Sequence, residues 1–461
     1  MSCLWDSIAL AGATGGAVLH GRDASVSLAE LAAGSTFGTA LESLRGRSVL
    51  IATREQLPTA LALAELDGLA RRVVLCTPDL TPEQLADVAA TAQADAIVKE
   101  AAAAAPATYM LSPRPIPGAI NRHASAVTEW ILLTSGTSGT PKLVVHTLQS
   151  LGGNLPTPSP SDAQPPTDTP IWSTFYDIRR YGGLQIYLRA VMSGSSLVLS
   201  SVGEPVSDFL ARAAAAGVTH ISGTPSHWRR ALMSGDAAIL TPRYVRLSGE
   251  VADQAVLDAL RTVYPTAKIT HAFASTEAGV AFDVNDGRAG FPRAIVDHPS
   301  NDIELKIVDH TLRIRSGRNA VRYLGTAQRA IASDDGYVDT GDRVELVHGR
   351  YYFRGRMGGV INVGGLKVYP EEVESVLNAD SRVRMSLVRA RRNPITGAVV
   401  VADVVLANPA SSGASRTPES VKKDLLEHCR RTLAAHKVPA ILRFVPALEM
   451  TAAGKLVRPG T

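Results

Sequence analysis

The sequence predicts an α/β protein that contains a parallel sheet and more than one domain. With 461 residues, the chain is longer than one hydrophobic core usually organises. Its composition, 45% hydrophobic and 20% charged, is ordinary for a globular protein. The N-terminal quarter alternates strand and helix signals, and this order is typical of parallel strands covered by helices.

The first predicted elements follow one another closely. Residues 48–54 read SVLIATR and have the apolar centre of a buried strand. Residues 57–71 place apolar side chains at helical spacing, and residues 73–76 predict the next strand. Another helix is expected to begin at Thr81, because this N-cap residue is followed by proline and then glutamate.

The middle of the chain supplies further elements. Residues 184–191 predict a buried helix, while residues 197–199 and 218–221 predict strands. Residues 303–315 alternate in polarity about a central Asp-His pair, which predicts a hairpin. Residues 154–170 contain six prolines without apolar periodicity, so we expect an exposed loop there.

Composition also bears on function. A formal charge of +4 without a run of Lys or Arg, and only 5% aromatic residues, give no footprint of nucleic-acid binding. Cys3, Cys76 and Cys429 are far apart and show no metal-ligand spacing, so we expect reduced thiols. The N-terminus lacks the form of a signal peptide, and the alanine run at 101–105 is too short to span a membrane. We therefore expect a soluble, cytoplasmic protein.

Residues 132–146 read LLTSGTSGTPKLVVH and predict a phosphate cradle. A glycine-rich turn exposes backbone N–H groups, hydroxyls add donors, and a lysine adds a mobile cation. The common P-loop pattern differs, because it places lysine directly after glycine and opens a helix, whereas β-branched residues follow here. By composition alone, the segment could equally be a surface turn. The candidate phosphate-binding residues are Thr134, Ser135, Gly136, Thr137, Ser138, Gly139, Thr140 and Lys142.

The ordered string T-S-G-T-S-G-T-P-K resembles the phosphate-loop signature of the adenylate-forming superfamily, which includes acyl-CoA synthetases, peptide-synthetase adenylation domains and luciferases. Further motifs of that superfamily follow in the same order between residues 134 and 455. Each of them is short and weak alone, but their joint order is specific.

Residues 271–279 read HAFASTEAG and resemble the Tyr-Gly-x-Thr-Glu motif of that superfamily. Phe273 takes the aromatic position, Ala274 takes the glycine position, and Ser275 follows. A flat ring can stack on adenine, the Thr276 hydroxyl can donate to the α-phosphate, and Glu277 offers hard oxygen ligands for Mg²⁺. Without the resemblance, Ser-Thr-Glu indicates a helix start.

Three further segments resemble nucleoside contacts. Gly249 and Glu250 belong to Leu-Ser-Gly-Glu, which resembles the segment that packs against adenine. Asp342 ends a Thr-Gly-Asp motif, and its carboxylate can accept both ribose hydroxyls. Arg356 ends the Gly-Arg pair that the resemblance assigns to ribose and phosphate. Without the resemblance, Thr-Gly-Asp indicates an Asp-Gly turn.

The C-terminal part predicts a compact α+β unit. We expect a small hairpin at residues 361–368 and a helix that opens at Pro370 with an acidic first turn. Residues 383–406 alternate like two strands, and residues 418–433 form an amphipathic helix. A last strand is expected at residues 441–445.

The resemblance divides the chain into a large adenylation domain of layered α/β subdomains, residues 1–357, and a small mobile α+β domain, residues 358–461. The small domain is expected to rotate about Gly358, where relatives usually carry Asp or Lys; glycine has the conformational freedom that a hinge needs. Thr-Ala-Ala-Gly-Lys, residues 451–455, resembles the C-terminal lysine motif and makes Lys455 the expected catalytic lysine.

One segment departs from the family pattern. Asp177 stands where relatives often carry a histidine near the bound acid. Arg179 and Arg180 follow it. Two interpretations stay open: they bind a second anionic group on the substrate or an anionic co-substrate, or they are solvated surface residues.

The resemblance implies an AMP-forming acid:CoA ligase. A carboxylic acid, small and aromatic or polar, would react with ATP and Mg²⁺ to an acyl adenylate and pyrophosphate, and the acyl group would pass to CoA. The alternative acceptors are a carrier-protein thiol, an amine or another nucleophile. A third hypothesis is a P-loop kinase or ATPase, or a non-catalytic nucleotide-binding module. The spacing of Lys142 argues against the kinase. Both a monomer and a homodimer remain open.

Overall fold

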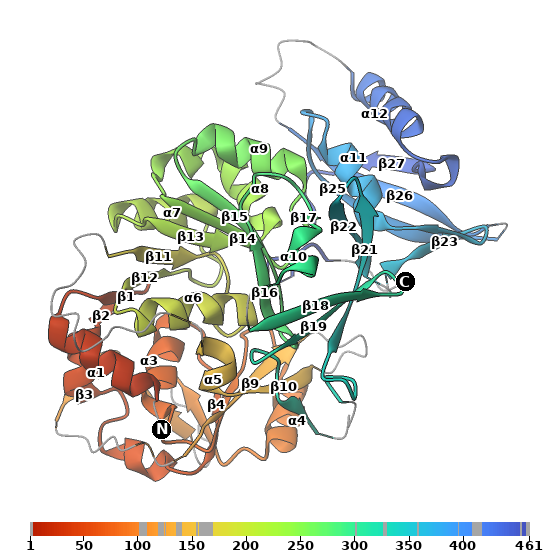
Figure 1. Cartoon of the computed structure of the whole chain (residues 1–461). Coiled ribbons are helices and arrows are strands. Elements are labelled where there is room, and N and C mark those ends of the chain that lie inside the picture. The colour runs from red at the N-terminus through yellow and green to blue at the C-terminus, as the bar shows by residue number, and fades with distance from the viewer. Residues whose placement is uncertain are drawn as a thin grey trace.

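The protein has a large N-terminal body of stacked sheets and helices, on which a smaller C-terminal body sits (Figure 1). This arrangement confirms the predicted α/β class with a small α+β C-terminal part. The computed structural model describes residues 3–100, 108–118, 124, 126–134, 141–153, 155, 169–299, 302–325, 330–356, 359–394, 396–407, 417–451 and 454–457.

The first sheet is mixed, with five consecutive parallel pairs at its centre. In order across the sheet, its described strands are β16 (Gly279–Val284), β15 (Lys268–Ser275), β14 (Tyr244–Ser248), β13 (His220–Gly223), β11 (Ile171–Thr174), β12 (Ser196–Leu199), β1 (Val18–His20) and β2 (Ser25–Ser27). The strand expected at 218–221 begins two residues later, because Val218 and Thr219 lie in the irregular segment between the turn after the preceding helix and the strand.

The second sheet carries the predicted phosphate loop. The first three predicted elements form its strand–helix–strand unit, as expected, with β4 and β5 parallel. The next helix begins after Thr81, whose side chain caps it as predicted. In order, the described strands are β20 (Arg322–Leu324), β10 (Lys142–His146), β9 (Glu129–Thr134), β5 (Arg72–Leu75), β4 (Ser48–Ile51), β6 (Ala96–Lys99) and β7 (Thr108–Met110).

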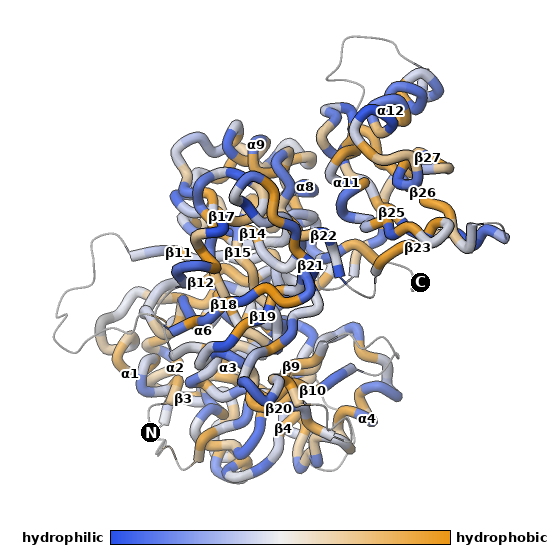
Figure 2. The backbone as a smooth tube through the Cα atoms, turned by 45° about the vertical axis from the view of Figure 1, so that its right-hand side comes forward, coloured by the Kyte–Doolittle hydropathy of each residue, from blue (hydrophilic) through white to orange (hydrophobic). Residues whose placement is uncertain are grey.

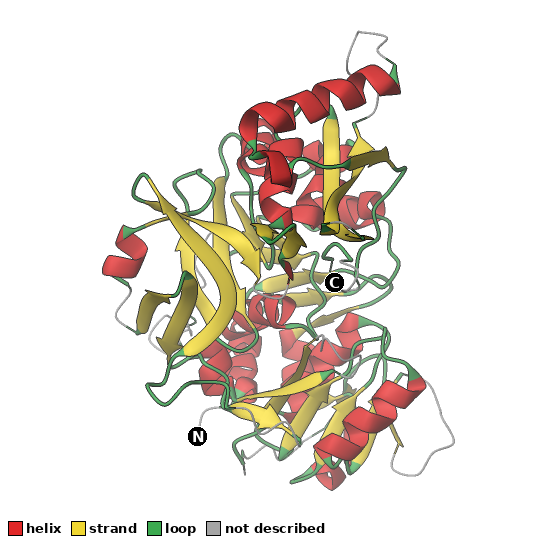
Figure 3. Cartoon of the chain, turned by 90° about the vertical axis from the view of Figure 1, so that its right-hand side faces the viewer, coloured by secondary structure: helices red, strands yellow, loops and turns green. Residues whose placement is uncertain are grey.

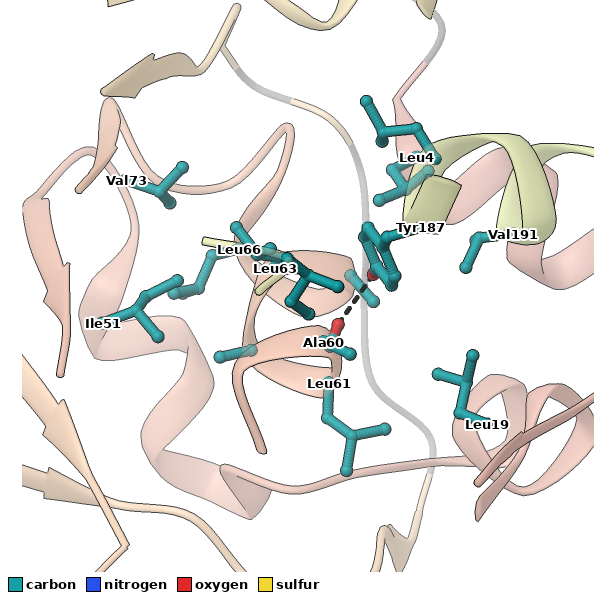
Figure 4. Close-up of a cluster of buried hydrophobic side chains, with 14 of the residues drawn as sticks. Leu4, Leu19, Ile51, Ala60, Leu61, Leu63, Leu66, Val73, Tyr187 and Val191 are labelled. Atoms are coloured by element: carbon teal, nitrogen blue, oxygen red, sulfur yellow. Dashed lines mark hydrogen bonds between the residues drawn. The ribbon is translucent and has the colours of Figure 1, made fainter. Parts of the chain in front are cut away.

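Helix α3 (Gln56–Leu66) lies between the two sheets and is buried along nearly its whole length. A helix that is apolar on all sides has to be covered on all sides. Its partner α6 (Tyr181–Met192) comes from the first sheet, and the Tyr187 hydroxyl donates to the Ala60 carbonyl at 2.7 Å. Figure 4 shows this contact among leucines from both layers. The shared core fixes the orientation of the two sheets.

The remaining helices of the large body pack around these two sheets, except α10 (Ala294–Asp297), which packs on strands of a third sheet. The α-helices are α1 (Leu4–Thr14), α2 (Leu28–Ala33), α4 (Pro82–Ala92), α5 (Leu148–Gly152), α7 (Val206–Ala215), α8 (Pro225–Ser234), α9 (Gln254–Val263) and α10. Short 3₁₀ turns and a two-strand ladder complete it: η1 (Gly38–Leu44), η2 (Asp236–Ile239), β3 (Gly34–Ser35) and β8 (Ile116–Pro117).

A third, strongly curved antiparallel sheet lies beside the first two and below the C-terminal body (Figure 3). In order, its described strands are β17 (Phe291–Pro292), β22 (Arg350–Arg356), β21 (Val338–Val347), β19 (Thr311–Ser316) and β18 (Ile303–Val308). The predicted hairpin at 303–315 is confirmed: Asp309 and His310 form its turn with φ of 50° and 64°.

The C-terminal body has its own core around Val388, Ala402 and Leu425. Its hairpins, helices and last strand agree with the expectations for residues 361–445. Figure 2 shows α12 as a mostly hydrophilic outer helix over apolar strands. The elements are β23 (Ile361–Val363), β24 (Leu366–Val368), α11 (Pro370–Asn378), β25 (Val383–Asn393), β26 (Gly397–Leu406), α12 (Pro418–Thr432), η5 (Ala435–Lys437) and β27 (Ile441–Phe444).

Three expectations concern residues that the structure does not describe. The proline-rich loop lies outside the described residues except for Leu155, Thr169 and Pro170. The hinge position Gly358 also lies outside them, so the domain boundary there stays a prediction. The same holds for residues 135–140 of the phosphate loop.

Candidate active site

The parallel strands β13, β14 and β15 end side by side at Gly223, Ser248 and Ser275. In α/β sheets, ligands bind beyond the carboxyl ends of such strands. Two of the predicted nucleotide-binding segments leave the sheet at this edge: Gly249–Glu250 follows β14, and Phe273–Glu277 closes β15. The fold therefore brings together motifs that the sequence separates.

The strands that flank the phosphate loop pair with each other. Thr134 at the end of β9 lies opposite Lys142 at the start of β10. Lys142 opens a strand rather than a helix, as the departure from the P-loop pattern predicts. Its Nζ lies 5.7 Å from the centre of the Tyr323 ring, and the Tyr323 hydroxyl donates to Glu277 Oε1 at 3.3 Å. The loop lysine and Glu277 thus both lie close to one tyrosine.

His146 ties the same strand to the Thr276 segment. Its Nε2 donates to the Thr276 carbonyl at 2.7 Å, and its Nδ1 lies 3.0 Å from Ser150 Oγ. The turn that it supports connects antiparallel strands β15 and β16, so the helix start that Ser-Thr-Glu indicates by itself is absent there. The Ser275 hydroxyl caps this turn by accepting from the Ala278 N–H at 3.0 Å.

The Phe273 ring lies in a row of aromatic side chains. Its centre is 5.2 Å from that of Phe353, with planes 11° apart, and 5.8 Å from that of Phe282. Phe273 and Ala274 remain half-buried at the edge of this row. Stacking of Phe273 on adenine stays a prediction.

Asp342 and Arg356 face each other across strands β21 and β22. Arg356 Nε donates to Asp342 Oδ1 at 3.2 Å. The Thr-Gly-Asp motif forms an irregularity inside β21 rather than a chain-reversing turn, because Gly341 adopts a φ of 68° within the strand. Desolvation raises the pKa of Asp342, while the charges of Arg356 and Lys455 act in the opposite direction.

Lys455 belongs to the C-terminal body and lies near Gly249 and Asp342. A Cβ atom placed on Gly249 would lie 3.4 Å from Lys455 Cε, so the lysine stem passes directly over that glycine. Although the residue keeps contact with solvent, surrounding protein atoms partly desolvate its ammonium and lower its pKa. The charge of Arg356 lowers this pKa further, whereas Glu250 and Asp342 oppose the shift.

The loop that carries Lys455 is held by α8 and the residue after Gly249. The Thr224 hydroxyl, at the N-cap of α8, donates to the Gly454 carbonyl at 2.8 Å. Glu250 accepts from the Ser226 N–H at 3.0 Å and from the Leu456 N–H at 3.3 Å. The carboxylate of Glu250 therefore links the large body to the C-terminal loop, besides any contact that it makes with a nucleotide.

The sequence profile described as "AMP-binding enzyme" matches residues 48–319, more than half of the chain. The chain belongs to the AMP-binding enzyme family. The profile of the "AMP-binding enzyme C-terminal domain" matches residues 372–455, which include the lysine loop.

Individual relatives match this AMP-binding enzyme over part of their length. A human mitochondrial acyl-coenzyme A synthetase, ACSM5, is 38% identical over 138 residues, which cover 30% of this chain and 23% of the relative. The 2-succinylbenzoate–CoA ligase of Salmonella typhimurium is 31% identical over 264 residues, or 56% of this chain and 53% of the relative. The chain's matches thus span about a quarter to a half of these two relatives.

A likeness to solved structures extends over the whole fold. The anthranilate CoA ligase AuaEII in complex with anthranoyl-AMP superposes with a TM-score of 0.81, covering 99% of this chain and 95% of that one at 19% identity. At this identity, the likeness establishes the fold of the AMP-binding enzyme and not its substrate.

Glu277 is suited to a magnesium ion that nucleotide phosphates also hold. Mg²⁺ commonly takes one or two carboxylates together with phosphate oxygens and water. One Glu277 oxygen accepts from Tyr323. Among the described residues, no group of three or more His, Cys, Asp and Glu side chains could bind a metal by itself. Glu277 would therefore hold a magnesium ion together with the nucleotide phosphates.

In the segment that departs from the family pattern, Asp177 and Arg179 have a structural role. Asp177 forms an ion pair with Arg179, with 2.6 Å between Oδ2 and Nη2, and Arg179 is completely buried. The predictions that Arg179 binds a substrate anion, or is solvated, are both wrong, because its guanidinium is already occupied by Asp177 and by the Thr53 carbonyl. Arg180 pairs with Asp79 at 3.0 Å, and its charge also acts on Lys455.

Several residues in and around the candidate site were not found from the sequence. His146 and Tyr323 position the predicted motif, and Arg189 and Arg246 line a cavity between α6 and the first sheet. One signal was present: both arginines interrupt otherwise apolar segments, LQIYLRAV and YVRLS. A buried charge within an apolar segment usually has a specific role.

None of the helices in the described part of the chain combines the length and the apolar character needed to cross a bilayer.

Proposed function

We propose that this AMP-binding enzyme activates a carboxylic acid with ATP and transfers the acyl group to the thiol of CoA. The carboxylate oxygen attacks the α-phosphorus, the bond from that phosphorus to the β-phosphate oxygen breaks, and pyrophosphate leaves with the electron pair. The protein has little covalent chemistry to perform, since its task is to align two anions and to stabilise charge on the transferring phosphorus.

The observation that carries this proposal is the position of Lys455 over Gly249, at the carboxyl edge of the first sheet. A cation at this point can neutralise both the attacking carboxylate and the α-phosphate. Asp342 and Arg356 are suited to the ribose, and Lys142 to the outer phosphates. Thr276 can donate to the α-phosphate, while Glu277 would hold the magnesium ion that supplies further neutralisation when it is bound.

For the second half-reaction, we propose that residues 358–461 rotate about Gly358 and withdraw Lys455. The thiol sulfur then attacks the acyl carbon, the bond between that carbon and the adenylate oxygen breaks, AMP leaves, and the thiol proton passes to solvent. The Gly364–Gly365 turn of the small body would approach the adenylate. In the structure its Gly364 N–H donates to the Thr396 carbonyl at 2.8 Å.

The names of the relatives support this reading, because two are CoA ligases and one is an acyl-coenzyme A synthetase. ATP–pyrophosphate exchange against a panel of small aromatic and aliphatic acids tests the first step. We expect exchange that depends on both the acid and Mg²⁺, with AMP as the nucleotide product. Formation of ADP, or turnover of ATP that no acid stimulates, would contradict the proposal.

A second experiment identifies the acceptor. The acid found by exchange is incubated with ATP and with CoA, a phosphopantetheinyl carrier protein, a simple amine, or no acceptor, and the acyl product is identified by mass spectrometry. We expect acyl-CoA. If acyl-carrier protein or an amide forms in place of acyl-CoA, another acceptor takes part in the second step. The proposed adenylation step would be unaffected by that result.

A further inference from the structure

A small cavity lies between α6 and the face of the first sheet. The residues that line it include Gln185, Arg189, Ser222, Arg246, Ser248 and Ala274. Its volume of about 20 Å³ is room for one water molecule. Ser248 and Ala274 belong to the edge that also carries Gly249 and Glu277, so this end of the cavity is the one nearer to Lys455.

The register of the sheet shows which end of the cavity is nearer to Lys455. Ser222, Arg246 and Thr270 lie opposite one another on β13, β14 and β15. Arg246 and Ser248 share one face of β14, with Ser248 nearer the carboxyl edge. On α6, Gly182, Gln185 and Arg189 share one side, and two helical turns of about 10 Å separate the first from the last. Arg189 therefore marks the end of the cavity remote from Lys455.

The two arginines that line the cavity, Arg189 and Arg246, differ in their ion pairs. Arg246 is paired on both nitrogens with Asp283, at 2.9 Å each. In the part of the chain that the structure describes, no carboxylate lies within ion-pair distance of Arg189, and its guanidinium rests over the Trp172 ring at 5.6 Å. The nearby Arg318 is itself paired with Asp302. The half-buried guanidinium of Arg189 thus has no counter-ion among the described residues.

This imbalance costs free energy in the unliganded protein. Desolvation lowers the pKa of Arg189, and the charge of Arg246 lowers it further. A second group in the cavity lining also lacks a partner. Ser222 Oγ is completely buried and has no hydrogen-bond partner among the described residues. Unsatisfied buried polar groups of this kind point to a ligand. A guanidinium fork together with a hydroxyl is suited to the two oxygens of a carboxylate.

We propose that the acid carries a second carboxylate, at the end remote from the carboxyl group that is activated, and that Arg189 binds it with support from Ser222. The inference rests on the proposed function and specifies its substrate class as dicarboxylic acids. Arg189 is then the residue that determines specificity. A monocarboxylic acid would leave the guanidinium desolvated and unpaired, and the site would discriminate against it. The present cavity volume requires side chains such as Arg189 to move as the acid enters.

The test is ATP–pyrophosphate exchange with matched acids. Straight-chain monocarboxylic acids are compared with α,ω-dicarboxylic acids of the same length, and benzoate with aryl acids that carry a remote second carboxylate. For wild-type protein, we expect kcat/KM to be about 100-fold higher for the dicarboxylic member of the preferred pair. The variant Arg189→Gln should lose this preference by losing activity on the dicarboxylic acid alone, and Arg189→Lys should retain part of it.

Two controls separate binding from folding. Arg431→Gln removes an exposed arginine of α12 that pairs with Glu427, and it should behave as wild type. Thermal stability is measured for wild type and Arg189→Gln with the dicarboxylic acid and without ATP. The acid should stabilise wild type and not the variant, whatever the turnover.

Equal kcat/KM for both members of every pair, or an equal loss on both acids in Arg189→Gln, would overturn the inference. If AMP formation fails with every acid, the proposed function fails, and the thermal measurement then decides the anion site by itself. Stabilisation confined to wild type supports the site; stabilisation of neither protein, or of both equally, rejects it.

Discussion

At the scale of single residues, His146 connects the phosphate-loop hairpin to the segment that carries Thr276 and Glu277. The side chain is completely buried, and burial lowers its pKa to about 4. The imidazole is therefore neutral at pH 7, which lets Nε2 donate to the Thr276 carbonyl while Nδ1 accepts from Ser150. Protonation would place a charge in the core and remove the acceptor.

Stability should consequently fall in mild acid. The folded pKa of His146 lies below the ordinary value of 6.5, so the unfolded chain binds the proton first. The contribution is complete above pH 6.5 and is lost as the pH falls toward 4; at pH 5 the loss amounts to about 2 kcal/mol. We expect the melting temperature to drop between pH 7 and pH 5, and to drop less in His146→Gln.

Part of this pH dependence should persist in the variant, because desolvation lowers the pKa of His227 as well, to about 3. His428→Gln, which changes an exposed histidine of α12, serves as the control and should retain the wild-type slope. A slope unchanged by His146→Gln would show that this side chain does not titrate on unfolding as described.

At the scale of elements, local geometry places the reactive groups. Gly454 has a φ of 68°, and a Cβ on it would lie 1.9 Å from two ring atoms of His227. The loop can therefore approach α8 only with glycine at this point. Gly349, in the turn between β21 and β22, has a similar φ of 77° but nothing within 4 Å of an added Cβ. Substitutions at Gly454 and Gly349 therefore separate the effect of backbone strain from the effect of a steric clash.

Gly454→Ala should slow adenylation by about tenfold or more, because the lysine loop can no longer seat against His227. Gly349→Ala carries the same backbone strain, so it should lower the melting temperature slightly and leave ATP–pyrophosphate exchange unchanged. Acid-dependent exchange and differential scanning fluorimetry measure the two effects. Equal activity of the two variants would mean that contact between Gly454 and His227 is irrelevant to the first step.

At the scale of the whole molecule, the site exists only where the two bodies meet. Lys455 comes from the C-terminal part, whereas Gly249, Asp342 and Glu277 come from the large body. Arg229 of α8 forms an ion pair with Asp253, which also accepts from Asn378 of α11 at 3.4 Å. These contacts join the two bodies in the present arrangement, and the proposed rotation would have to break the one between Asn378 and Asp253.

Lys455→Ala should therefore separate the two half-reactions. Acid-dependent pyrophosphate exchange should fall by about 100-fold or more, because a cation at the reacting phosphorus is removed. Formation of acyl-CoA from a synthetic acyl adenylate should be largely preserved. Equal loss of both activities would contradict the rotation of the C-terminal domain. Lys437→Ala, which removes an ion pair with Glu372 inside the C-terminal body, provides a comparison for effects on folding alone.

Much of the fold could be predicted because its signals are local. Hairpin turns, capped helices and buried strands depend on neighbouring residues, and the predictions at 48–76, 303–315 and 361–445 are confirmed within a few residues. The Ser-Thr-Glu segment shows the limit of this approach. Its local signal for a helix start is overridden by pairing of β15 with β16, which the short segment does not encode.

The order of residues along the chain was enough to predict the family, the parallel α/β plan and the set of motifs whose roles are predicted for ATP. Three features follow only from the three-dimensional packing: Arg179 is buried against Asp177, Arg189 faces a cavity and has no counter-ion among the described residues, and Lys455 lies over Gly249. The physical reason is one of distance along the chain. A motif is written in adjacent residues, whereas the burial and pairing of a charge depend on which remote strands and helices pack around it.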